Sequence, residues 1–158
     1  MRIKPAQGFT LIELMITVAI GIVMVGGGLA AYRGAGEREE GKLAGLGFQT
    51  NLKSFQQKAF AGEKPVGCLG TLEDFRIEVG AGLGSYIVKA ECSLVDGPET
   101  EFELIQGVEF DAIFSDLIFY TLKSEIGGAQ TIVINSAEGN YTYEITVEAS
   151  GVIQGELL

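Results

Sequence analysis

Residues Phe9 to Tyr32 read FTLIELMITVAIGIVMVGGGLAAY, an apolar stretch in which Glu13 and Tyr32 carry the only ionisable side chains. A helix over this stretch rises about 36 Å at 1.5 Å per residue, which exceeds a hydrocarbon thickness of about 30 Å. We therefore expect a membrane-spanning helix over residues 9–32. The flanking charges leave its orientation open, because Arg2 and Lys4 precede it while Arg33 and Arg38 follow it.

A cleaved secretory signal peptide is the first alternative for this stretch, because Ala30 and Ala31 are small residues near its end. Two features argue against it: the apolar run is long for a signal, and it carries Glu13 near its start. An ionised carboxylate costs roughly 2.5–3.5 kcal/mol at the centre of a membrane helix, and less near an end. Such a residue usually has a partner or a function, so Glu13 is the first candidate functional residue.

The residues around Glu13 resemble a known N-terminal signature. Lys4 is followed by Gly8-Phe9-Thr10-Leu11-Ile12-Glu13-Leu14, so that a glutamate lies four residues after a phenylalanine inside an apolar helix. This pattern resembles the N-terminal signature of type IV pilins and of type II secretion pseudopilins. The resemblance implies that the N-terminus lies on the cytoplasmic side of the membrane.

The resemblance also implies a role for each residue of the signature. Residues 1–8 would form a leader peptide, which a prepilin peptidase would cut between Gly8 and Phe9, and Phe9 would then be N-methylated. Glu13 would neutralise the N-terminal ammonium of a neighbouring subunit during assembly, in agreement with the rule that a buried charge is tolerated only when paired. The alternative is that Glu13 merely reaches the lipid headgroups from near the helix start.

Residues 33–61 are expected to continue the helix as an amphipathic segment, and Pro65 cannot belong to it. The triplet Gly26–Gly28 predicts a weak point in the helix. The resemblance implies that this segment unwinds when the subunit enters a filament, and a kink near residues 34–36 is the alternative. Gly41 and Gly45 have the GxxxG spacing of close helix packing. Small and apolar residues at spacings of three and four trace one face. That face comprises Gly41, Ala44, Gly45, Phe48, Leu52, Phe55 and Ala59, and much of the remainder is Gln49, Lys53, Gln56, Gln57 and Lys58.

Residues 62–158 predict a β-rich head. Turn signals such as Gly127-Gly128 separate its apolar runs, and the boundaries between residues 102 and 120 are not assigned. The predicted fold is therefore α+β: a long N-terminal helix, with a membrane half and an amphipathic half, packed on a mostly antiparallel β-sheet head. The strands are indicated by alternation of apolar and polar residues over 75–79, 86–92 and 141–148, and by the β-branched run around Ile132 and Ile134.

Cys68 and Cys92 are the only cysteines of the chain. The membrane orientation implied by the resemblance puts both on the oxidising side, which favours a disulfide worth roughly 3 kcal/mol through loop closure. Two free buried thiols are the alternative. A redox role is not expected, because the spacing is not C-x-x-C.

The composition of the 158 residues excludes several classes of function. Without histidine the chain has neither Ser-His-Asp nor Cys-His catalysis and no imidazole-based zinc site, and two cysteines cannot make a four-thiolate zinc site. A formal net charge of −10 disfavours nucleic acid as a partner. Hard cations such as calcium take clustered carboxylates, but the spacing does not match an EF-hand loop, so we expect solvated acidic surface and no metal or other cofactor. The cluster consists of Asp96, Glu99, Glu101 and Glu103.

These inferences predict a non-enzymatic structural subunit of a type IV pilus-like filament, with a minor pilin as the first choice. A type II secretion pseudopilin is the second choice and a major pilin the third. The alternative from another class is a signal-anchored extracytoplasmic binding domain or enzyme. The expected partners are a prepilin peptidase, other pilin or pseudopilin subunits, an inner-membrane assembly platform and, before assembly, membrane lipids. The expected location is the cytoplasmic membrane, as a single-pass protein with its N-terminus inside, and then an extracytoplasmic filament.

Overall fold

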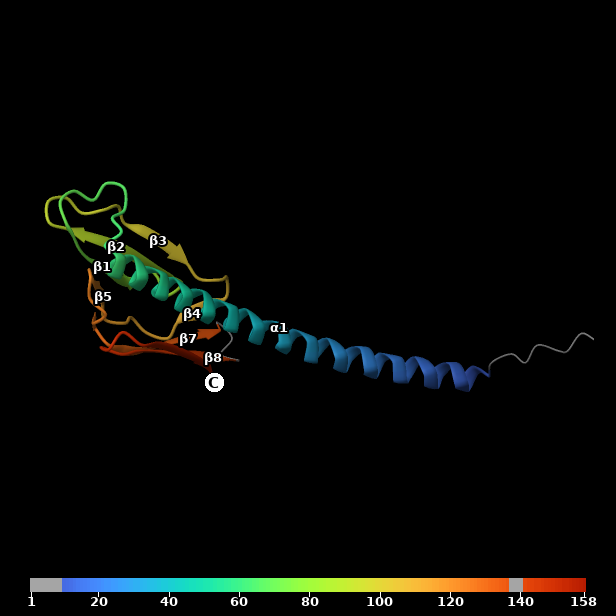
Figure 1. Ribbon diagram of the computed structural model, residues 1–158. Helices are drawn as coiled ribbons and strands as arrows, with labels where there is room; N and C mark the ends of the chain where they lie inside the picture. Colours follow the sequence, from blue (N-terminus) through green and yellow to red (C-terminus); the bar gives the residue numbers. More distant parts are fainter. Residues whose placement is uncertain (1–9, 137–140) are drawn as a thin grey trace, which may run out of the picture. The chain divides into compact units, whose positions relative to one another are not determined.

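The computed structural model describes residues 10–136 and 141–158, and within the helix it describes the side chains outside residues 26–35 and 37. The chain divides into two units, Met1–Gly36 and Glu37–Leu158. The boundary lies inside the helix α1 (Leu11–Ala61), which is helical through the glycine triplet (Figure 1). The two units are considered separately below.

Helix α1 ends at Ala61 and is followed by Gly62, three residues before Pro65. Gly62 has a φ of 66°, in the left-handed region that favours glycine. The Gly62 N–H donates to the Ala59 carbonyl at 3.0 Å, and the Glu63 N–H donates to the Lys58 carbonyl at 2.9 Å. These two bonds form a Schellman motif, which satisfies the last carbonyls of the helix.

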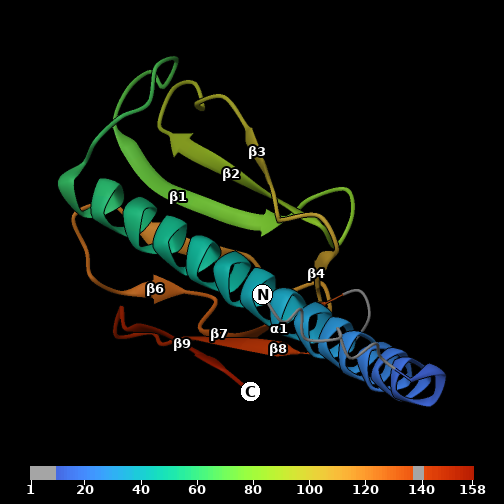
Figure 2. The same cartoon turned by 90° about the vertical axis from the view of Figure 1, so that its right-hand side faces the viewer.

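The head contains two antiparallel sheets rather than one. The first has the strand order β3-β2-β1-β5-β6 and the second has the order β4-β7-β8-β9. Within the Glu37–Leu158 unit, α1 lies between them, with β1 and β2 on one side and β7 and β8 on the other (Figure 2). The strands are β1 Leu72–Val79, β2 Ser85–Cys92, β3 Thr100–Glu103, β4 Val108–Phe110, β5 Leu117–Tyr120, β6 Ile126–Gly127, β7 Gln130–Ser136, β8 Thr142–Val147 and β9 Ile153–Leu157.

The predicted α+β class is confirmed, and the burial of the strands follows the alternation in the sequence. In β2, the side chains of Tyr86, Val88 and Ala90 are buried while those between them are half-buried. The period of two arises because successive side chains of a strand point to opposite faces. β4 and β5 lie in the stretch whose boundaries the sequence left unassigned, and β3 overlaps its start; each of the three is four residues long or shorter.

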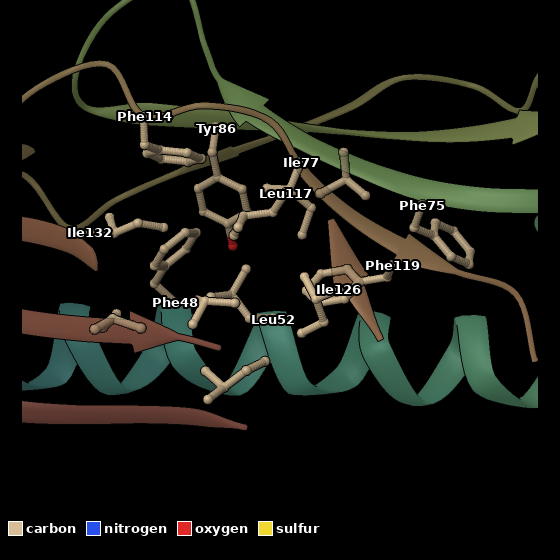
Figure 3. Packing of buried hydrophobic residues seen from close by; sticks show 14 of the residues in the cluster. Phe48, Leu52, Phe75, Ile77, Tyr86, Phe114, Leu117, Phe119, Ile126 and Ile132 are labelled. Carbon is tan, nitrogen blue, oxygen red and sulfur yellow. The ribbon is translucent and has the colours of Figure 1, made fainter. Parts of the chain in front are cut away.

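One hydrophobic core joins the helix to both sheets. Phe48 and Leu52 of α1 point toward Tyr86, Ile77 and Leu117 of the first sheet (Figure 3). The Phe48 ring lies 4.8 Å from that of Tyr86 and 5.1 Å from that of Phe110 in β4, in edge-to-face arrangements. All buried hydrophobic side chains that the structure describes belong to Glu37–Leu158, so this unit contains its own core.

The predicted apolar face of the helix is buried, but the opposite face is not uniformly polar and solvated. Gln49 is only 9% exposed: its Nε2 donates to the Ile153 carbonyl at 3.3 Å, and its Oε1 accepts from the Tyr143 hydroxyl at 3.5 Å. Gln56 is half-buried and donates to the Gly151 carbonyl at 2.7 Å. Both glutamines face the second sheet, which explains why they are buried although they lie outside the apolar face.

Candidate functional site

The start of α1 is stabilised by Thr10, a contact that sequence reasoning missed. The Thr10 Oγ1 accepts a hydrogen bond from the Glu13 N–H at 3.3 Å, and the Thr10 carbonyl accepts from the Leu14 N–H at 3.2 Å. This is the geometry of an N-cap, with Glu13 at the third helical position. The T-x-x-E spacing of a capping box was the available signal. Glu13 therefore lies in the first helical turn, where the helix dipole favours a negative charge.

The segment that follows Glu13 presents apolar side chains to its surroundings on every side. The large hydrophobic residues from Leu11 to Val25 are 52–78% exposed. Glu13 forms no ion pair with any residue that the structure describes. The segment thus combines an unpaired carboxylate with a wide apolar surface, and neither finds a partner within the described chain.

The predicted cleavage position, methylation position and membrane span of this segment stay predictions. Gly8 and Phe9, the predicted cleavage and methylation positions, lie outside the described residues. Over the described part of the chain, no helix is at once long enough and apolar enough to cross a membrane. The span over residues 9–32 therefore remains a prediction.

Two glycines with GxxxG spacing pack closely, but against tyrosines of the head rather than against another helix. A Cβ atom added to Gly41 would lie 1.5 Å from Cε2 of Tyr141, and one added to Gly45 would lie 2.2 Å from Cδ1 of Tyr143. Both distances are far below van der Waals contact. The two glycines therefore let the second sheet approach the helix.

Cys68 and Cys92 form the predicted disulfide, with their Cα atoms 5.8 Å apart. The bond joins the segment after α1 to the end of β2. Leu69 and Val95 form an isolated antiparallel bridge beside it. The segment between the helix and the first sheet is therefore held at two neighbouring points.

Three of the four residues in the acidic cluster each bind a different group of the chain. Asp96 accepts from the Cys92 N–H at 2.9 Å, Glu99 pairs with the Lys89 ammonium at 3.2 Å, and Glu101 accepts from the Ser85 hydroxyl at 2.6 Å. Among the residues that the structure describes, no group of three or more acidic, cysteine or histidine side chains is arranged to hold a metal ion.

Asp74 is a buried carboxyl group that sequence reasoning did not single out. It lies in β1 opposite Glu91 of β2, is 8% exposed, and its Oδ1 has no hydrogen-bond partner among the described residues. Burial and, next, the nearby Glu91 carboxylate raise the pKa of Asp74 from 3.8 to about 6, against the opposing effect of Arg76. Its place in an alternating polar position of β1 gave no sign of this burial.

Comparisons with known proteins bear on the N-terminal signature and on the fold. Residues 3–29 match the family model described as the prokaryotic N-terminal methylation motif. The fold is similar to that of the minor pseudopilin EpsH from the type 2 secretion system of Vibrio cholerae, with a TM-score of 0.54 and 12% sequence identity. The match covers 73% of this chain and 94% of that chain. No curated protein gave a significant match by sequence.

An N-terminal methylation motif followed by a pseudopilin-like α+β fold defines the class: the chain is a type IV pilin-like or pseudopilin-like protein. The resemblance first noted at Lys4, Gly8, Phe9 and Glu13 is thereby confirmed. At 12% identity the structural likeness carries the fold alone, so the choice between pilin and pseudopilin is not made by it.

Proposed function

We propose that the protein is a non-catalytic structural subunit of a type IV pilus-like filament. The observation that carries this proposal is the first turn of α1, where Thr10 caps a helix that bears Glu13 and an exposed apolar surface. A carboxylate in apolar surroundings is tolerated when an opposite charge pairs with it. A neighbouring subunit supplies both the missing charge, as its N-terminal ammonium, and apolar side chains to cover the helix.

The proposed maturation begins with removal of residues 1–8 by a prepilin peptidase, which cuts between Gly8 and Phe9 and methylates Phe9. The match of residues 3–29 to the methylation motif supports this step. Before assembly, residues 9–32 cross the cytoplasmic membrane with the N-terminus inside and contact its lipids. An inner-membrane platform then transfers the subunit to an extracytoplasmic filament, in which the helix is central and the β-rich head faces outward.

A minor pilin and a type II secretion pseudopilin are both compatible with this proposal. The minor pilin was the first choice from the sequence. The fold is similar to that of a minor pseudopilin over 94% of that chain, but this likeness does not separate the two alternatives. Co-purification with components of a type 2 secretion system would establish the pseudopilin alternative.

The mature N-terminus tests the proposal directly. The protein is extracted from membranes of cells with an active prepilin peptidase, and its intact mass and N-terminal peptide are measured. We expect a chain that begins with N-methylated Phe9, and a chain that keeps residues 1–8 when the peptidase is inactivated. An intact Met1 in the presence of the active peptidase would exclude the proposed maturation.

A further inference from the structure

Strand β3 is an open edge of the first sheet. It pairs on one side with β2, from Ser85 opposite Glu103 to Val88 opposite Thr100, and it is the terminal strand in the order β3-β2-β1-β5-β6. In the described chain no other strand pairs with its second side, and Figure 2 places it at the margin of the sheet. An unpaired strand edge offers backbone N–H and C=O groups to another extended segment.

A cavity of about 300 Å³ lies directly beside this edge. Two β3 side chains, Thr100 and Phe102, form one of its walls. The rings of Phe75 and Phe102 lie 5.7 and 5.8 Å from that of Phe55 in α1, so three aromatic side chains converge there. A cavity of this size accepts one or two large apolar side chains. The remaining lining residues are Lys58, Glu63, Lys64, Pro65, Val88, Ala90 and Pro98.

The rim of the cavity is fixed by contacts within the chain. The disulfide between Cys68 and Cys92 ties the segment after α1 to the end of β2, and the Gly97 N–H donates to the Ala90 carbonyl at 2.9 Å. The Lys64 ammonium donates to the Gly70 carbonyl at 2.6 Å. A site held open in this way loses little conformational entropy when it is filled.

The two faces of β3 differ in charge, and this difference selects the chemistry of an occupant. Thr100 and Phe102 line the cavity, whose other lining residues are mostly apolar and include Lys58, Glu63 and Lys64. Glu101 and Glu103 alternate with them and line a separate depression on the other face. A strand added to β3 therefore fits best with apolar side chains toward the cavity and basic side chains toward Glu101 and Glu103.

We propose that β3 and this cavity form a docking site for an extended segment of a different protein, in which apolar and basic residues alternate. Backbone hydrogen bonds to β3 supply affinity and the cavity supplies specificity, as in other strand-addition interfaces. A second copy of this chain is a poor occupant, because Lys123 is the only basic residue after Glu91 and the short edge strand β9 carries Glu156. The inference concerns a partner of the head and stands apart from filament assembly.

Synthetic peptides test the proposal on the Glu37–Leu158 unit, which holds every buried hydrophobic side chain that the structure describes. The probe is acetyl-Lys-Phe-Lys-Val-Lys-amide. Its controls are the same peptide with Glu in place of Lys, and the same peptide with Ser in place of Phe and Val. By isothermal titration calorimetry we expect saturable binding of the probe and of neither control, and the probe should slow amide hydrogen exchange at residues 100–103.

Two charge reversals on edge strands locate the site. Glu103→Lys in β3 should weaken probe binding about fivefold, because a favourable cross-strand charge pair becomes a repulsive one. Glu156→Lys makes the same change in net charge on β9, an edge strand of the second sheet, and should leave binding unchanged. The proposal would be overturned if both variants weakened binding equally, or if the acidic peptide bound as well as the probe. It would also be overturned if β3 were protected from hydrogen exchange without the probe and sedimentation showed that the protein self-associates.

Discussion

The two parts of α1 differ in how much apolar side chain they carry and in where those side chains lie. From Leu11 to Val25 the large hydrophobic residues are at least half exposed, whereas Phe48 and Leu52 are buried in the core of the head. The difference in exposure follows from content and from pattern, because the first part is apolar on every side whereas the second has one apolar face. A helix with one apolar face buries it against its own chain, but a helix that is apolar all round needs apolar surroundings on every side.

The largest effect should come from removing a core ring of the second part. Phe48→Ala deletes a ring that contacts Tyr86 and Phe110, and truncations of this kind cost about 3–5 kcal/mol. Leu14→Ala, in the first part, should leave the unfolding of the head unchanged. Urea denaturation followed by circular dichroism compares the two variants; a similar loss in both would contradict the assignment of the core to Glu37–Leu158.

Replacing Glu13 should have the opposite effect to replacing Phe48: it should impair assembly and leave the stability of the head unchanged. Glu13→Gln removes the charge but keeps the size of the side chain. We expect filament incorporation to fall about tenfold or more, because an unpaired ammonium would remain in apolar surroundings.

Glu39→Gln is the matched control for Glu13→Gln, since Glu39 is exposed on the same helix outside the apolar segment. Incorporation is measured by quantifying each variant in sheared filaments and in the membrane fraction. Normal incorporation of Glu13→Gln would remove the basis for the proposed ion pair.

The buried carboxyl group of Asp74 makes the stability of the second part depend on pH. Its pKa is raised from 3.8 to about 6 in the folded state, so the folded state holds this proton more tightly than the unfolded chain does. This contribution to stability is therefore present at low pH and is lost as the pH rises from about 4 to about 6. Asp74→Asn should abolish the loss and gain about 3 kcal/mol at pH 7.

Denaturant unfolding at pH 4, 5, 6 and 7 checks the behaviour of Asp74, with Glu109→Gln as an exposed control. The full chain and the Glu37–Leu158 unit should give the same pH dependence, because Asp74 lies entirely within that unit. A pH profile of Asp74→Asn identical to that of the parent protein would contradict the assignment.

The smallest effects should distinguish two glycines on opposite sides of α1. Gly45→Ala places a methyl group against the Tyr143 ring and should destabilise the head by roughly 1–3 kcal/mol. Gly47→Ala meets open space and should stabilise it by up to about 1 kcal/mol through helix propensity. Melting temperatures of the two variants decide the point, and shifts of the same sign would contradict the close approach of β8 to the helix.

Several details could not be predicted because they depend on residues far apart in the sequence. The period of the helix identified Phe48 and Leu52 as buried, but Gln49 and Gln56 are covered by Ile153 and Gly151, about a hundred residues later. The spacing of Gly41 and Gly45 indicated close packing but not its partner. The capping role of Thr10 is local, and its T-x-x-E spacing was sufficient to predict it.

The sequence by itself determined the features that depend on neighbouring residues: the apolar segment with Glu13, the methylation motif, the amphipathic face and the alternating strands. Tertiary structure alone decided that the head has two sheets, that the helix lies between them, and that Asp74 is buried. It also decided that β3 remains an open edge beside an aromatic cavity. The physical reason is that periodicity reports which side of an element is apolar, whereas the partner that covers this side is fixed only when distant segments pack together.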